Sequence, residues 1–233
     1  MSYSTIVKEK INTYSELEII DAQKIYTSTL KNIPEQTYYK TISRMTRNGE
    51  LERLAKGIYC KPKIGRFGRM VSSEKHILEH YLGAHGRSGV IVGYRMYYKY
   101  KLTTQLSKVI VIYSNVSKQE KKKVMNVEIK KANIRFDPSS IKMVELLDFL
   151  ENIHNIEELN KTNALDFIEE AIEFYSDKTL EKLLKTIGYK KSTLASLKSV
   201  LDHYKVSHSV GKYLNELSNY KAINMEDFYE FTR

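Results

Sequence analysis

The feature that most constrains this chain is an abrupt change of hydrophobic period at Asn48-Gly49. Before it, Tyr38, Ile42 and Met45 recur at the i, i+4, i+7 spacing of one helical face. Pro34 is tolerated at a helix start, and the Asn48-Gly49 pair is typical of a helix end. After it, residues 50–54 and 58–60 are short strand-like runs joined by a glycine-containing turn. The pattern predicts a helix over residues 35–47 followed by a tight hairpin.

Two further helices are expected upstream. Residues 5–12 have partial helical spacing, and Asp21 is a suitable N-cap for a helix that runs to about Leu30. Three helices followed by a hairpin is the plan of a winged helix-turn-helix. We therefore expect such a domain over residues 1–66.

The third helix has side chains of the kinds that read DNA. Gln36 can pair bidentately with adenine and Arg44 with guanine, while lysine and further arginine side chains can reach base edges or phosphates. A helix-turn-helix can also serve protein contacts, so this alternative stays open. The predicted DNA-binding residues are Gln36, Thr37, Lys40, Ser43, Arg44 and Arg47 on this helix, Arg53 and Lys56 on the wing, and Lys61 and Lys63 beyond it.

The charge of the chain is unevenly distributed. Residues 1–131 carry a formal net charge of +14 and residues 132–233 carry −4, within a total of +10. Such an asymmetry is expected when one part of a chain meets a polyanion, although RNA or anionic lipid would be attracted as well. A lysine cluster expected on a loop between two strands could add phosphate contacts to DNA. Its members are Lys118 and the auxiliary candidates Lys121, Lys122 and Lys123.

Two sequence blocks carry a resemblance to a known family. Residues 34–62 resemble the N-terminal winged helix of the AbiEi-like antitoxins, and residues 93–105 resemble the family segment that ends in Leu-Thr-Thr-Gln. Tyr98 stands where asparagine is common, and Lys101 stands where glycine commonly precedes the signature. Residues 207–223 resemble a degenerate version of the C-terminal motif of this family.

The resemblance implies a transcriptional repressor that is the antitoxin of a type IV toxin–antitoxin pair. Its partners would be double-stranded operator DNA and a nucleotidyltransferase-like toxin encoded next to it. A stand-alone winged-helix regulator, or a non-specific nucleic-acid binder without a toxin partner, is the alternative.

A second domain is expected over residues 70–233, after a linker at residues 66–70. A cap at Ser72-Ser73-Glu74 introduces a helix over residues 75–82, and a small sheet and then helices follow, so the predicted fold class is α+β. The expected strands are residues 90–92, 109–113, 124–130 and 133–136, and the expected helices are residues 142–152, 162–175, 177–187, 190–204 and 209–217.

Signatures of catalysis are weak or absent. His76 and His80 form an H-x-x-E-H pattern, which would bind zinc in a hydrolase, but core packing of the same helix explains it better. No phosphate-binding loop or serine nucleophile elbow occurs, and the lone Cys60 is expected to be a packed residue. We predict no enzyme activity, no cofactor and no metal. One cysteine, no signal peptide and no long apolar run favour the cytoplasm without a membrane partner.

Overall fold

The computed structural model describes residues 2–66, 68–215 and 220–229. The chain divides into two compact units, and the fold class is α+β as predicted. The first unit comprises Met1–His80 with Lys123–Val127, and the second comprises Tyr81–Lys122 with Glu128–Arg233. Among the residues described, no helix combines the length and the apolar character needed to cross a lipid bilayer.

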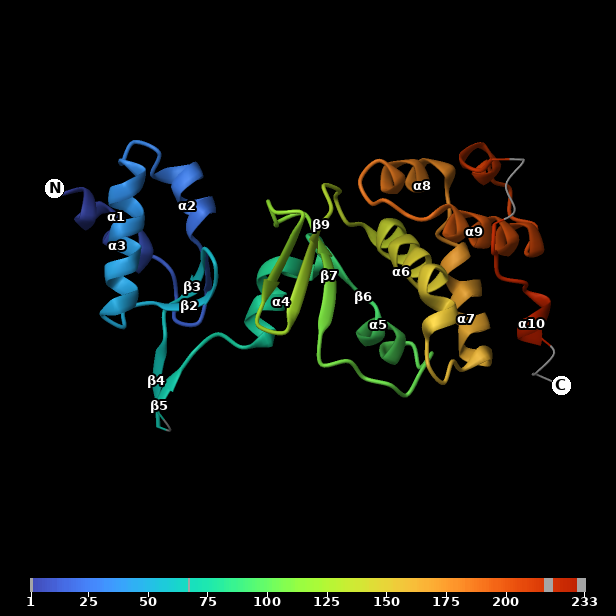
Figure 1. Cartoon of the computed structure of the whole chain (residues 1–233), viewed down its shortest axis with the longest axis horizontal. Coiled ribbons are helices and arrows are strands. Elements are labelled where there is room, and N and C mark those ends of the chain that lie inside the picture. The colour runs from blue at the N-terminus through green and yellow to red at the C-terminus, as the bar shows by residue number, and fades with distance from the viewer. Residues whose placement is uncertain (1, 67, 216–219, 230–233) are drawn as a thin grey trace. The chain divides into compact units, whose positions relative to one another are not determined.

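The first unit has the winged-helix order of elements (Figure 1). Strands β1, β2 and β3 form an antiparallel sheet in the order β1-β3-β2, with β2 and β3 as the wing hairpin. Strand β1 was not predicted, because three residues are too short to show a period. The elements are α1 (Tyr3–Asn12), β1 (Ile19–Asp21), α2 (Ala22–Thr29), α3 (Glu35–Arg47), β2 (Glu52–Ala55) and β3 (Ile58–Cys60).

The predicted core face of α3 is confirmed. Tyr38, Ile42 and Met45 are each at most 1% exposed and pack with residues of α1 and α2. The Tyr38 hydroxyl donates to the backbone oxygen of Ala22 at 2.8 Å, so it connects α3 to the start of α2. Asp21 caps α2 as expected, with its carboxylate accepting from the backbone N of Lys24 at 2.9 Å. These contacts hold α3 firmly in place, with its opposite face outward.

The expected linker over residues 66–70 is wrong. This segment contributes to a two-stranded hairpin of β4 (Lys63–Gly65) and β5 (Gly68–Met70), in which Gly65 pairs with Gly68. Gly68 has φ = +104°, a conformation that glycine adopts without steric cost. Arg69 reaches back to Glu52 of β2 with an N–O distance of 2.9 Å, so the hairpin is tied to the wing.

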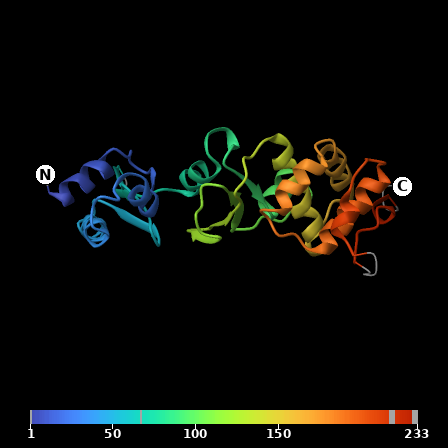
Figure 2. The same ribbon diagram turned by 90° about the horizontal axis from the view of Figure 1, so that it is seen from above.

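The chain after the β4–β5 hairpin, which includes the second unit, forms a sheet and a helical bundle, which Figure 2 shows from above. The sheet has the strand order β6-β7-β9-β8, which leaves β8 at an edge. The elements after the hairpin are α4 (Glu74–Leu82), β6 (Gly89–Val92), α5 (Tyr94–Lys99), β7 (Ile110–Ser114), β8 (Lys121–Val124), β9 (Val127–Lys131), α6 (Pro138–Asn152), α7 (Lys161–Ile172), α8 (Asp177–Leu184), α9 (Lys191–His203) and α10 (Glu226–Tyr229), with 3₁₀ turns at Ala84–Gly86, Ile153–Asn155 and Val210–Tyr213.

Helix α6 is central to the core of this unit. Asp137 and Ser140 form a capping box with Pro138 in the first turn, so the helix starts about a turn earlier than predicted. The helical pattern predicted for the core residues is confirmed, since all of them are buried. They are Leu146, Leu147 and Leu150 on α6, and Leu165, Ile168, Ala171 and Ile172 on α7.

Three other expectations fail after residue 120. The strand expected over residues 124–130 is interrupted by a turn at Met125-Asn126, where Met125 has φ = +53°. Residues 133–136 form no strand, and helix α5 was not predicted. Of the helix expected over residues 209–217, only a 3₁₀ turn at Val210–Tyr213 is observed, and residues 216–217 lie outside the described part of the chain, as does part of the 207–223 motif.

The Leu102-Thr103-Thr104-Gln105 segment is hydrogen-bonded to a loop more than fifty residues later in the chain. Leu102 is fully buried, and the Thr103 hydroxyl donates to the backbone oxygen of Glu157 at 2.7 Å. Thr104 and Gln105 both donate to the carboxylate of Glu158, at 2.6 and 3.2 Å. These bonds lower the pKa of Glu158. The segment therefore fastens the chain after α5 to the loop that leads into α7.

Candidate nucleic-acid interface

The exposed face of α3 lies opposite its buried stripe. Successive helical residues turn by about 100°, so Gln36, Lys40, Ser43 and Arg47, at i, i+4, i+7 and i+11, form one stripe. All four are exposed. Arg44 is also exposed, but it lies to one side of this stripe together with the half-buried Thr37. Five of the six predicted helix residues are therefore exposed, and Arg47 lies nearer the centre of the stripe than Arg44 does.

The cations of this face are not neutralised. In the part of the chain that the structure describes, Lys40, Arg44 and Arg47 form no ion pair and no side-chain hydrogen bond. Other cations of the same unit differ: Lys8 pairs with Glu50 at 3.2 Å and Arg69 pairs with Glu52. Three unpaired positive charges on one helix face can therefore meet a polyanion without first breaking an internal bond.

The wing presents two more unpaired cations. Arg53 on β2 and Lys56 in the turn are exposed, and neither has an ion-pair partner among the described residues. The turn is defined by Gly57, which has φ = +75° and whose backbone oxygen accepts from the N of Ala22 at 3.0 Å. This bond fixes the wing against the start of α2.

The two lysines predicted beyond the wing have different environments. Lys61 donates to the backbone oxygens of Asn12 and Tyr14, at 3.4 and 3.0 Å, so its ammonium group satisfies backbone acceptors at and just after the C-terminal end of α1. We therefore leave Lys61 out of the interface that we propose below. Lys63 is exposed at the start of β4.

Sequence reasoning missed the β4–β5 hairpin as a basic element. Arg66 is exposed at its turn, and Arg69 stands on β5. The hairpin also exposes apolar surface, since Ile64 is 75% and Met70 is 50% accessible. Gly65 and Gly68, with Ile64 before the first and Met70 two residues after the second, were the available signal for a hairpin.

The cluster of Lys121, Lys122 and Lys123 is on a strand and not on a loop. Lys121, Lys122 and Lys123 belong to the edge strand β8, and Lys121 and Lys123 are exposed. Edge strands commonly carry lysine, because charge discourages pairing with another chain. Their proposed contact with phosphates stays a prediction.

The His76-Ile77-Leu78-Glu79-His80 pattern lies on α4. Nδ1 of His76 accepts from the backbone N of Ser73 at 3.1 Å, and Ile77 is fully buried. Across the described residues, no group of three or more His, Cys, Asp or Glu side chains is placed to hold a metal ion. Cys60 is buried in β3.

Comparisons with known proteins add little to this geometry. No protein-family model and no curated protein sequence matches the chain. Among solved structures, the chain is similar to the RV2827C protein from Mycobacterium tuberculosis, with 11% identity and a TM-score of 0.39. That match covers 86% of this chain and 76% of the other. A similarity at this level supports no functional inference.

Proposed function

We propose that this protein is a DNA-binding transcriptional repressor. The observation that carries the proposal is the outward stripe of α3, on which Lys40 and Arg47 are exposed and unpaired while Tyr38, Ile42 and Met45 anchor the opposite face. Arg47 lies seven positions after Lys40, which is a rise of about 10 Å, comparable to the roughly 12 Å width of the major groove. Helix α3 would lie in that groove.

Each α3 side chain then has a distinct task. Gln36 and Ser43 offer neutral hydrogen bonds to base edges, whereas Lys40 and Arg47 combine charge with donors for guanine or phosphate. Arg53 and Lys56 on the wing would hold the adjacent backbone or enter the minor groove. The α3 stripe provides specificity, and the cations of α3 and of the wing add affinity that falls as salt rises.

The antitoxin role rests on the family resemblance alone. It implies that the repressor regulates its own operon and counteracts a nucleotidyltransferase-like toxin, in the cytoplasm and by binding rather than catalysis. A solitary regulator would bind operator DNA equally well, so the toxin has to be tested separately. Co-expression of the chain with the product of the neighbouring reading frame tests it, and rescue of growth is the expected result.

Fluorescence anisotropy tests the DNA-binding proposal. The ligands are the duplex just upstream of the reading frame, a shuffled duplex of equal composition and a single-stranded RNA, each measured over a salt series. We expect a preference of about a thousandfold for the upstream duplex at near-physiological salt. Equal and steeply salt-dependent binding to all three would instead indicate a charge-driven binder without an operator.

A further inference from the structure

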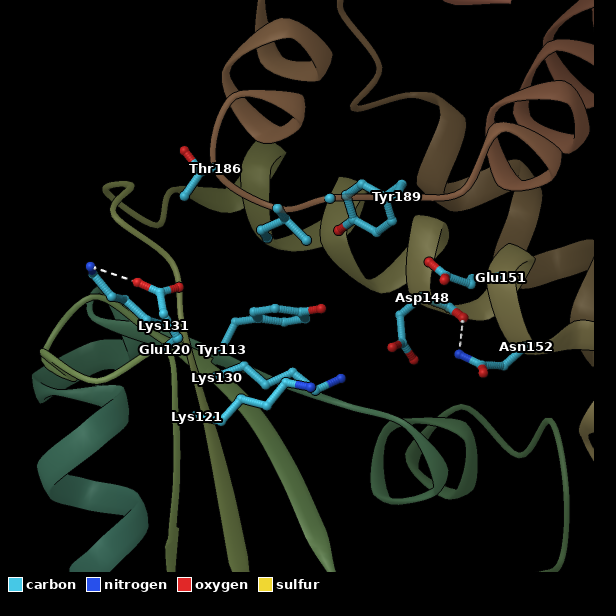
Figure 3. Close-up of a pocket in the computed structure, with 12 residues that line it drawn as sticks. Tyr113, Glu120, Lys121, Lys130, Lys131, Asp148, Glu151, Asn152, Thr186 and Tyr189 are labelled. Carbon is cyan, nitrogen blue, oxygen red and sulfur yellow. Dashed lines mark hydrogen bonds and ion pairs between the residues drawn. The ribbon is translucent and has the colours of Figure 1, made fainter.

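The second unit contains a polar cleft of ≈ 360 Å³ between its sheet and helix α6 (Figure 3). Residues of β7, β8 and β9 form one wall, α6 forms another, and the segment 186–189 after α8 closes the cleft. This volume is in the range of small-molecule sites. The side chains of the two main walls differ in charge, and that difference indicates the ligand.

The sheet wall presents two adjacent lysines. Lys121 on β8 and Lys130 on β9 are neighbours across the strands, and Figure 3 shows them extending side by side into the cleft. Neither forms an ion pair among the described residues, whereas the next lysine, Lys131, pairs with Glu120 at 2.9 Å. Like charges on neighbouring strands repel each other. An anion bound between them would remove that repulsion.

The helix wall presents hydrogen-bond acceptors. Oδ2 of Asp148 accepts from the Tyr97 hydroxyl at 2.7 Å and from the backbone N of Gly93 at 2.9 Å, which leaves Oδ1 without either bond. The side-chain amide of Asn152 donates to the backbone oxygen of Asp148 at 2.8 Å, so its own oxygen can accept from a ligand. The remaining acid of this wall, Glu151, pairs with Lys190 at 3.5 Å.

Aromatic surface lies between the two walls. Tyr113 is half-buried in the cleft, with the Lys130 ammonium 5.3 Å from its ring centroid, and Tyr189 stands on the closing segment. Figure 3 shows the Tyr113 hydroxyl directed into the cleft toward α6. A flat ring with polar edges could contact such surface and still reach both walls.

We propose that this cleft binds a mononucleotide. Its phosphate would lie between Lys121 and Lys130, whose two unpaired charges match a dianion. Amino or ring N–H groups of its base would donate to Asp148 and Asn152, because a carboxylate oxygen accepts from such groups. The site is separate from the α3 surface, and it does not depend on whether the protein is a repressor.

Isothermal titration calorimetry of the full chain tests the proposal. The probes are the four ribonucleoside 5′-monophosphates, the corresponding nucleosides and inorganic phosphate. We expect at least one monophosphate to bind ten or more times more tightly than both its nucleoside and inorganic phosphate. Absence of binding by every monophosphate at millimolar concentration would overturn the proposal, and so would equal affinity for phosphate alone.

Variants locate the binding. Lys121→Gln and Lys130→Gln should each weaken the best monophosphate at least tenfold, and Asp148→Asn should change the order of preference among the four bases. Lys178→Gln is the matched control, because Lys178 is an exposed lysine of the same unit outside the cleft, and it should bind as the wild type does. An equal loss in Lys178→Gln, or wild-type affinity in both cleft lysine variants that melt normally, would place the binding elsewhere.

Discussion

Replacing the three unpaired α3 cations by glutamine should flatten the salt dependence of operator binding. Each phosphate contact contributes about 0.9 to the slope of log affinity against log salt. If Lys40, Arg44 and Arg47 each neutralise one phosphate, the triple glutamine variant loses about 2.7 of that slope. Between 50 and 200 mM salt the wild type would then lose roughly fortyfold more affinity than the variant.

The assay is anisotropy of the labelled upstream duplex at several salt concentrations, for the wild type, the three single variants and the triple variant. Lys10→Gln on α1 is a suitable control, because Lys10 forms no ion pair among the described residues and is not on α3. It should leave the slope unchanged within the error of the measurement. A triple variant with the wild-type slope would refute the assignment of α3 to DNA, whatever its absolute affinity.

Three further predictions concern the scaffold. Tyr38→Phe removes the buried bond to Ala22 and should lower the free energy of unfolding by about 1 kcal/mol in urea denaturation; an unchanged value would refute the bond. Lys101 has φ = +56°, so Lys101→Gly should raise the melting temperature with a gain of up to about 1 kcal/mol, and a clear loss would contradict this. Burial raises the pKa of Asp148, so the carboxyl group binds its proton more tightly in the folded state than in the unfolded state. The stability that this proton contributes is lost as pH rises through the raised pKa. Asp148→Asn should therefore gain stability relative to the wild type as pH rises above about 4, and a constant difference would contradict the shift.

The N-terminal unit was largely predictable because its signals are local. The α3 stripe, the Asp21 cap and the turn at Gly57 each depend on residues close together in sequence. Strand β1 is different, because Ile19–Asp21 becomes a strand only by pairing with β3, some forty residues later in the chain. The predicted role of Lys61 did not anticipate its contact with the end of α1, for the same reason.

The chain after the β4–β5 hairpin was harder to predict because its strands are short and its chain reversals are unusual. Strand β8 consists of three lysines and one valine, which shows no apolar alternation, and it is stabilised by its neighbour β9. Met125 occupies a left-handed turn position where glycine or asparagine would have been a clear signal. Lys101 also has a positive φ, at the position where the resembled family commonly has glycine, so its residue type does not indicate the turn. The polar cleft joins β7, β8, β9, α6 and the segment 186–189, so no single motif indicates it.

Site-specific photocrosslinking tests the central claim most directly. A photoreactive amino acid at Ser43, in the middle of the α3 stripe, is compared with the same group at Lys10 on α1, each in complex with the upstream duplex. We expect that the Ser43 position crosslinks to a few adjacent bases of one sequence register and that the Lys10 position does not crosslink to bases. A stable complex in which Ser43 gives no base crosslinks would show that another surface binds the DNA.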